Sequence, residues 1–267
     1  MTKIVICGVA GRMGQRLAHL TLTAADLELC GGKERPDHEA VGRDIGEVVG
    51  ARHLGLTVSD TLSGIVEPDQ VVVCFTTPEA TLEDAALCAV RGVPMVVGTT
   101  GFTPEQLAEF ERTVADITCV FASNFSTAMN VLFKLVEEAA RILGDDYDVE
   151  IIEAHHRHKV DAPSGSALTL AERAAAGLGR NLREVAVHGR EGVVGERSRQ
   201  EIGMHAIRAG DLAGEHSVLY AAPGECLELQ HRATSRDSFA LGALRAARFA
   251  AQAEPGMYSM GDVLGLG

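Results

Sequence analysis

The sequence predicts an α/β domain with a doubly wound parallel sheet, followed by a second domain of the α+β class. Short apolar runs alternate with helical patterns over the first 125 residues, which is typical of a parallel sheet with right-handed crossovers. One of these runs, residues 70–75 (QVVVCF), is almost entirely apolar, as expected for a strand that is buried on both faces. Aromatic residues are scarce, with 8 Phe, 3 Tyr and no Trp, so we expect a core of Val, Leu, Ile and Ala.

Local patterns predict the elements of the first domain. Pro78 is suited to the first turn of a helix that Gly92 ends as its C-cap. Thr103 is expected to be the N-cap of the next helix, because Gln106 stands at the capping-box position. The expected strands are residues 3–7, 27–30, 70–75, 93–97 and 119–122, with an earlier helix over residues 13–22.

The pattern changes after residue 125. Residues 127–143 repeat apolar side chains at helical spacing, and residues 149–154 form a strand pattern before an Ala-rich helix over 166–178. Residues 204–233 alternate and turn without long helices, which predicts antiparallel strands. We therefore expect a first domain at 1–125, rejoined by the C-terminal helix and tail 237–267. The second domain is expected at 126–236.

Charge and cysteine usage exclude several classes of function. The chain has 24 Lys and Arg against 37 Asp and Glu, a net charge of −13, which disfavours nucleic acid or an anionic membrane as a partner. The six cysteines include no C-x-x-C pair, which argues against a disulfide framework. The N-terminal segment lacks the long apolar region of a signal peptide, and no stretch is typical of a membrane span. We therefore expect a cytoplasmic protein.

A glycine-rich motif, GVAGRMG at residues 8–14, lies between an expected strand and an expected helix. It is a G-x-x-G-x-x-G, with Ala10 at the second glycine position of the usual G-x-G-x-x-G. Such glycines let the backbone approach a pyrophosphate, whose charge the helix N-terminus stabilises. A turn that serves packing alone is the alternative. Glu34 lies 20 residues after Gly14, where an acid that holds the adenosine ribose is expected, and this favours a Rossmann-type dinucleotide site.

Arg35 directly follows that acid. An Arg at this place meets the 2′-phosphate of NADP, whereas Glu34 favours the free hydroxyl of NAD, so the pair predicts that either cofactor is used. A solvated turn over residues 33–35 is the alternative.

Two polar turns follow later strands of the expected sheet. Residues 98–101 (GTTG) follow one strand and residues 122–125 (ASNF) follow the next. Ligands of doubly wound sheets bind beyond the carboxyl ends of the strands, so both turns are expected near the cofactor. Without further support, ordinary polar turns are an equal alternative.

A basic run, HHRHK at residues 155–159, leaves a strand end in a chain of strongly negative net charge. This local reversal of sign is what an anionic substrate requires. Residues 163–166 (PSGS) then open a helix, whose first amides have no partners within the helix and are suited to a carboxylate. A metal site, a nucleic-acid contact and a solvated basic loop are the alternatives. The first lacks an H-E-x-x-H motif or a nearby cysteine, and the second is weakened by the acidity of the chain.

The longer run EIIEAHHRHKVDAPSGSA, from Glu150 to Ala167, resembles the signature of the dihydrodipicolinate reductase family. It departs from that signature at Ser166, where the family has Thr, and this change keeps the hydroxyl. The resemblance extends to the glycine-rich motif, Glu34, Arg35, residues 98–102 and 124–126, and the segments RAGD, GEH and SR-x-x-FA. It therefore spans nearly the whole chain.

The resemblance implies hydride transfer from NADH or NADPH to a cyclic dicarboxylate, 4-hydroxy-tetrahydrodipicolinate, in the diaminopimelate route to lysine. It also implies a homotetramer that forms through the second, substrate-binding domain. No metal is expected, because the basic run lacks the motifs named above. His155 would be a proton donor or acceptor and Lys159 the proton donor, while His156, Gly165 and Ser166 would hold the substrate. The implied cofactor-binding residues are Gly8, Val9, Ala10, Gly11, Arg12, Met13, Glu34, Arg35, Gly98, Thr99, Thr100, Ala122, Ser123, Asn124 and Phe125.

Two other functions are compatible with a dinucleotide-binding fold. A non-catalytic dinucleotide-binding sensor has no need of His155 and Lys159. An aldehyde or amino-acid dehydrogenase shares the wound domain but gives no reason for the HHRHK and PSGSA segments. The reductase is therefore the preferred hypothesis.

Overall fold

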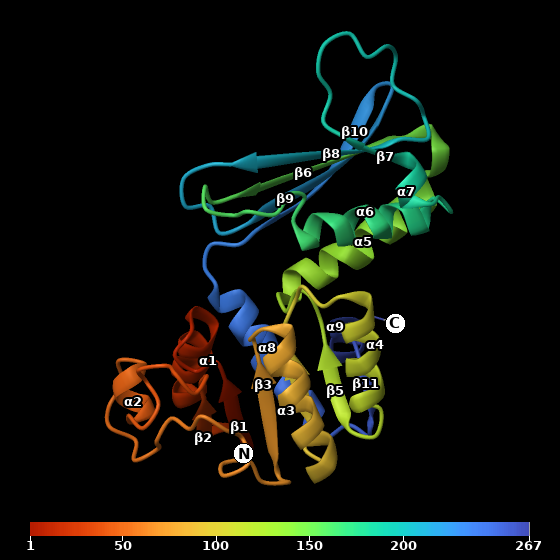
Figure 1. Cartoon of the computed structure of the whole chain (residues 1–267). Coiled ribbons are helices and arrows are strands. Elements are labelled where there is room, and N and C mark those ends of the chain that lie inside the picture. Colours follow the sequence, from red (N-terminus) through yellow and green to blue (C-terminus); the bar gives the residue numbers. More distant parts are fainter. Residues whose placement is uncertain (267) are drawn as a thin grey trace. The chain divides into compact units, whose positions relative to one another are not determined.

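The computed structural model describes residues 1–266 and divides into two compact units (Figure 1). The first unit comprises Met1–Thr127 and the segment that begins at Arg236, and the second comprises Ala128–Ser235. Among the described residues, no helix is long and apolar enough to cross a membrane.

A six-stranded sheet, parallel throughout, forms the centre of the first unit (Figure 1). Its strands, in spatial order, are β11 (Gly256–Tyr258), β5 (Thr118–Phe121), β4 (Met95–Val97), β3 (Gln70–Cys74), β1 (Thr2–Cys7) and β2 (Leu27–Lys33). All five residues of β3 are buried, as its apolar sequence predicts. The doubly wound α/β architecture of the first unit is thereby confirmed. The sequence did not predict β11, which has only three residues and begins at a glycine.

Helices cover both faces of this sheet. Helices α1 and α8 contact each other on one face, and α3 and α4 contact each other on the other, with a separate hydrophobic cluster beneath each pair. The helices are α1 (Arg12–Thr23), α2 (Ile45–Val48), α3 (Pro78–Arg91), α4 (Pro104–Thr113), α8 (Asp237–Ala250) and α9 (Met260–Leu264). The predicted Thr103–Gln106 capping box is present, and Gly92 ends α3 in the left-handed conformation at φ 68°.

The second unit is a five-stranded mixed sheet, in the order β10-β9-β6-β8-β7, with helices on one face. Its strands are β6 (Asp148–His155), β7 (Ala186–His188), β8 (Ile202–Arg208), β9 (Glu215–Ala222) and β10 (Glu225–Arg232). Its helices are α5 (Thr127–Leu143), α6 (Gly165–Gly177) and α7 (Leu182–Val185), with a 3₁₀ turn at Gly144–Asp146. Apolar side chains of α5, α6 and the sheet form one core, in which the Tyr220 hydroxyl donates to the Val136 carbonyl at 2.6 Å.

The prediction of antiparallel strands over residues 204–233 is only partly correct. Strand β9 is antiparallel to both β6 and β10, but β8 is parallel to β6 and to β7. The chain leaves β6 through α6 and α7 into β7, and a long loop then leads from β7 to β8. Such crossovers join parallel strands. Alternation of side chains reports which residues face the core, but it carries no information about the direction of the neighbouring strand.

Candidate active site

A pocket of about 920 Å³ opens at the carboxyl ends of β1, β2 and β3. The strand order reverses here, because β2 and β3 lie on opposite sides of β1, and doubly wound sheets bind ligands at this point. Five of the predicted cofactor residues line the pocket: Gly8, Gly11, Arg12, Glu34 and Arg35. The volume lies within the usual range of ligand pockets, roughly 300–1,000 Å³.

The glycines of residues 8–14 are required by close backbone contacts. Gly8 has φ +75°, and a Cβ on Gly14 would lie 2.0 Å from the Gly8 carbonyl oxygen. Val9 points into the core, where a Cβ on Gly32 would approach its side chain to 2.9 Å. The loop therefore passes tightly over the end of β2, and its side-chain-free backbone can approach a phosphate group.

Glu34 and Arg35 are adjacent in the sequence but have very different surroundings. Glu34 is buried, and its Oε1 accepts a hydrogen bond from the Ala10 amide at 2.9 Å. The Arg35 side chain is 70% exposed and pairs with Asp37 at 3.0 Å. The glycine-rich loop thus fixes the carboxylate, while solvent surrounds the guanidinium.

The two later turns pack closely against buried side chains. Thr99 is buried, and its hydroxyl lies 2.7 Å from the Thr81 hydroxyl and accepts from the Thr76 amide at 3.3 Å. A Cβ on Gly98 would lie 2.2 Å from the Phe75 ring, which also packs edge-on against Phe125 at 5.5 Å. None of residues 98–100 or 122–125 lines the pocket described above. The predicted cofactor roles of these two turns stay predictions.

An ion pair that the sequence did not predict forms part of the pocket wall. The Lys33 ammonium contacts the Asp84 carboxylate, and both residues are largely buried. Cys7 and Cys74 stand opposite each other on β1 and β3, and one ligand atom from each, with one from Asp84, lies within 4.8 Å of the others. A hydrogen bond with Cys7, together with burial, raises the pKa of Cys74 well above its usual value, so this thiol stays protonated. Nothing in the sequence links Lys33 to a helix position 51 residues later.

In the second unit, a buried carboxylate organises the start of the basic run. Glu153 is 1% exposed and accepts four hydrogen bonds. Arg208 donates two of them, each at 2.8 Å, and the Ser164 amide donates one at 3.1 Å. The fourth joins the carboxylate to His155 Nδ1 at 2.5 Å. Although burial opposes it, the hydrogen bonds from Arg208 and His155 lower the pKa of Glu153, so this residue is an anion at neutral pH.

The Glu153 contact determines how His155 presents its ring. A carboxylate accepts hydrogen bonds, so Nδ1 carries the proton and Nε2 is the reactive nitrogen. Gly214 keeps that nitrogen accessible, because a Cβ there would lie 3.1 Å from Nε2. Burial lowers the pKa of His155, although Glu153 opposes the shift. The ring is therefore neutral at pH 7, with an available lone pair on Nε2.

The remaining predicted substrate residues lie on the same loop and helix. The Lys159 ammonium contacts both Asp161 oxygens at 2.8 Å, and His156 Nδ1 is buried without a hydrogen-bond partner among the described residues. Helix α6 begins at Gly165, which is exposed, and a Cβ there would meet no atom within 4 Å. Packing therefore does not require this glycine, and its backbone is open to approach from outside. Ser166 follows it, half-buried in the first turn.

Two family models cover the chain. The model described as the N-terminus of dihydrodipicolinate reductase matches residues 2–125, and the model of its C-terminus matches residues 128–264. The chain belongs to the dihydrodipicolinate reductase family. It is accordingly an oxidoreductase, and the glycine-rich pocket of its N-terminal part supports a nicotinamide cofactor.

Individual relatives agree with this assignment. The 4-hydroxy-tetrahydrodipicolinate reductase of Alkalilimnicola ehrlichii is 52% identical over 99% of both chains. That of Syntrophobacter fumaroxidans is 48% identical over 100% of both chains. A dipicolinate-bound dihydrodipicolinate reductase from Paenisporosarcina sp. TG-14 superposes with a TM-score of 0.75, at 27% identity over 97% of each chain.

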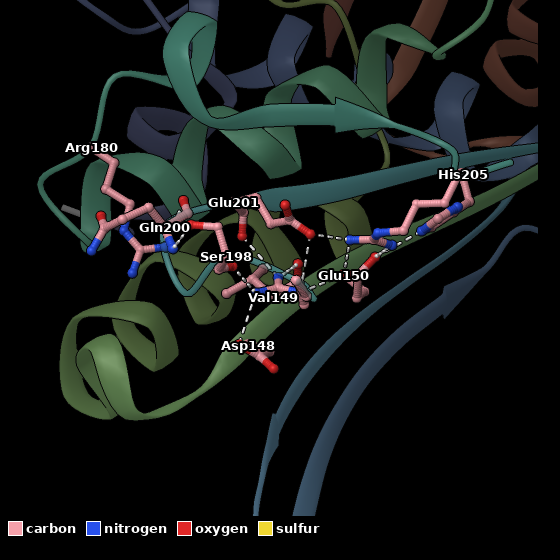
Figure 2. A network of polar contacts seen from close by, with 10 residues as sticks. Asp148, Val149, Glu150, Arg180, Ser198, Gln200, Glu201 and His205 are labelled. Carbon is pink, nitrogen blue, oxygen red and sulfur yellow. Dashed lines mark hydrogen bonds and ion pairs between the residues drawn. The ribbon is translucent and has the colours of Figure 1, made fainter. Parts of the chain in front are cut away.

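Figure 2 shows a second polar network in the second unit, formed around Glu150. It lies on the face of the five-stranded sheet opposite to the one that α5 and α6 cover. Glu150 accepts hydrogen bonds from Arg190, Arg197 and His205, at 2.7 to 3.1 Å. Although burial opposes the shift, these donors lower the pKa of Glu150 to about 2. A Cβ on Gly203 would lie 1.8 Å from its carboxylate, so the glycine lets Glu150 lie over β8. Glu150 and Glu153 therefore point to opposite faces of the sheet and serve separate networks.

Proposed function

We propose that this chain reduces 4-hydroxy-tetrahydrodipicolinate with a hydride from NADH or NADPH and a proton, giving tetrahydrodipicolinate and water in the diaminopimelate route to lysine. The observation that carries the proposal is the buried Glu153–His155 pair beside Lys159 and the N-terminus of α6. It combines groups that transfer protons with groups that bind a carboxylate. Relatives of about 50% identity bear the name of this reductase.

The first unit would hold the cofactor. Glu34 is positioned by the Ala10 amide to accept hydrogen bonds from the ribose hydroxyls, and the glycine-rich loop with the start of α1 would bind the pyrophosphate. Arg35 would reach a 2′-phosphate by leaving Asp37, so both NADH and NADPH would bind. The nicotinamide supplies the hydride.

The second unit would hold the dicarboxylate and manage the proton. The amides of Gly165 and Ser166 at the start of α6, with the side chains of Lys159 and His156, would bind the carboxylates. Lys159 would deliver a proton to the reduced intermediate. His155 Nε2, which carries a lone pair, would accept a proton and could then donate it.

We further propose a cytoplasmic homotetramer assembled through the second unit. Helices α5 and α6 cover one face of its sheet, whereas the opposite face carries the Glu150 network and the exposed side chain of Ile207. Light scattering on the purified protein, coupled to size exclusion, tests the tetramer.

The function is tested by following NADPH and NADH oxidation optically after the product of the preceding aldolase-type synthase is added. Turnover with either cofactor is the expected outcome. A non-catalytic sensor would bind NADPH without turnover, but no observation favours that alternative. Binding with no turnover of either cofactor would contradict the reductase.

A further inference from the structure

His216 lies beside the proposed substrate site without belonging to the basic run. It is 4% exposed and stands on β9, directly opposite Glu153 on β6. Its ring meets the His155 ring edge to face, with centroids 5.2 Å apart. The ring is therefore enclosed by the residues that surround the proposed chemistry.

One contact of His216 reaches the helix that would bind the carboxylate. Its Nε2 lies 3.1 Å from Ser164 Oγ, and the same oxygen accepts a hydrogen bond from the Ala167 amide at 3.1 Å as the N-cap of α6. The Ser164 amide donates to Glu153 at 3.1 Å. Ser164 is thus held from two strands, through its amide by β6 and through its hydroxyl by β9.

The contact with Ser164 is made through one ring nitrogen. Nδ1 is buried and has no hydrogen-bond partner among residues 1–266. Nε2 and Ser164 Oγ share one hydrogen bond, in which the imidazole N–H or the serine hydroxyl is the donor, depending on the tautomer. In both tautomers Nε2 is the atom that holds Ser164 Oγ.

A positive charge on the buried His216 ring would be energetically unfavourable. Burial is the main cause that lowers the pKa of His216, to about 4, and the neighbouring His155 adds to the shift. His216 is therefore neutral at working pH, and it does not exchange protons with substrate in the way that His155 does.

We propose that His216 is a positioning residue, whose Nε2 hydrogen bond fixes Ser164 and thereby the N-terminal amides of α6 that would receive the substrate carboxylate. The inference rests on the proposed reductase function and adds to it a residue that touches neither substrate nor cofactor. It follows that loss of this hydrogen bond weakens substrate binding more than it slows turnover. Losing one neutral hydrogen bond corresponds to about a two- to tenfold change.

The test compares two amide side chains of different length. The Gln side chain can put an amide group, which both donates and accepts hydrogen bonds, near the position of Nε2, whereas the shorter Asn side chain cannot. We expect His216→Asn to raise KM for the substrate about three- to tenfold with kcat changed less than twofold. His216→Gln should stay within twofold of the unchanged protein. Calorimetry with dipicolinate as probe should show the same order, while the Kd for NADPH is unchanged in both variants.

Two controls keep the outcome interpretable. His188→Asn, at an exposed histidine of the same unit, should have no effect on KM. In a Ser164→Ala background, His216→Asn should add no further rise in KM, because both changes remove the same contact. Equal KM values for the Gln and Asn variants, or additive effects with Ser164→Ala, would overturn the inference. If the unchanged protein shows no turnover with either cofactor, the reductase proposal itself fails, which is a separate result.

Discussion

The proposed cofactor pocket and the proposed substrate site are built from different parts of the chain. In the cofactor pocket the contacts are mainly those of backbone, because glycines at 8 and 14 bring the loop close over β2 and Glu34 accepts from a loop amide. In the substrate site side chains dominate, since Glu153 joins Arg208, His155 and the start of α6. A site formed by backbone needs glycines at fixed spacing, and this spacing can be read from the sequence. A site formed by side chains depends on partners from several strands, and the sequence does not show which strands lie together.

The two sites also differ in how far their charged groups are exposed to solvent. The guanidinium that would read a 2′-phosphate is exposed, whereas the Glu153 carboxylate is buried and fully hydrogen-bonded. An exposed charge is screened and contributes modestly, while removal of one partner from a buried pair is costly. Substitutions in the two regions should therefore differ in both size and kind.

The largest effect is expected at the proposed proton-transfer groups. His155→Ala and Lys159→Ala should each lower kcat about 10²–10⁴-fold, since general acid–base catalysis typically contributes this much. The Kd for NADPH should not change, because the substitutions lie in the second unit. Lys3→Ala, at a lysine paired with Asp69, serves as control. Near-normal kcat in both variants would show that the roles are wrongly assigned.

A loss of stability should follow from removal of the buried carboxylate. Glu153→Ala leaves Arg208 and His155 without their shared acceptor, and we expect the free energy of unfolding to fall by about 3–5 kcal/mol. Urea titration followed by circular dichroism measures it. Glu228→Ala, at an exposed glutamate on β10, should change stability by less than about 0.5 kcal/mol. If Glu153→Ala and Glu228→Ala lost similar amounts of unfolding free energy, the buried hydrogen bonds of Glu153 would not be important for stability.

The buried histidine predicts a dependence of stability on pH. The pKa of His216 is about 4 in the folded protein, below the ordinary 6.5. Between these values the unfolded chain binds a proton that the folded chain does not, so stability is complete above pH 6.5 and falls as pH falls toward 4. The expected loss is about 3 kcal/mol. Urea titrations across this range should show a smaller loss for His216→Gln, and equal losses would contradict the assignment.

The smallest effect is expected for Arg35, the exposed arginine that lines the proposed cofactor pocket. Arg35→Ala should weaken NADPH by about ten- to 150-fold, the effect of one charge-assisted hydrogen bond, and NADH much less. Fluorescence titration with each cofactor measures the ratio. Arg52→Ala, at an exposed arginine of the same unit, should leave both affinities unchanged. Equal weakening of the two cofactors by Arg35→Ala would show that Arg35 does not read the 2′-phosphate.

Patterns within short segments predicted much of the fold. The parallel sheet, the helix over residues 127–143 and the Thr103 capping box followed from periodicity and local hydrogen-bonding rules. Short elements such as α2, β7 and β11 were missed, because three or four residues are too few to show a period. The parallel direction of β8 was also missed, since it depends on the path of the preceding loop.

By itself the sequence determined the class of fold, the glycine-rich loop, the family and the segment that carries His155 and Lys159. Each of these depends on residues that are near one another along the chain, so spacing alone reveals them. Only the tertiary structure decided that Glu153 orients His155, that Lys33 pairs with Asp84 and that His216 holds Ser164. The last two contacts join residues more than 50 positions apart, and strand register with helix packing, rather than local propensity, brings such residues together. Burial then fixes which of these groups are charged, because desolvation acts only once the chain has closed around them.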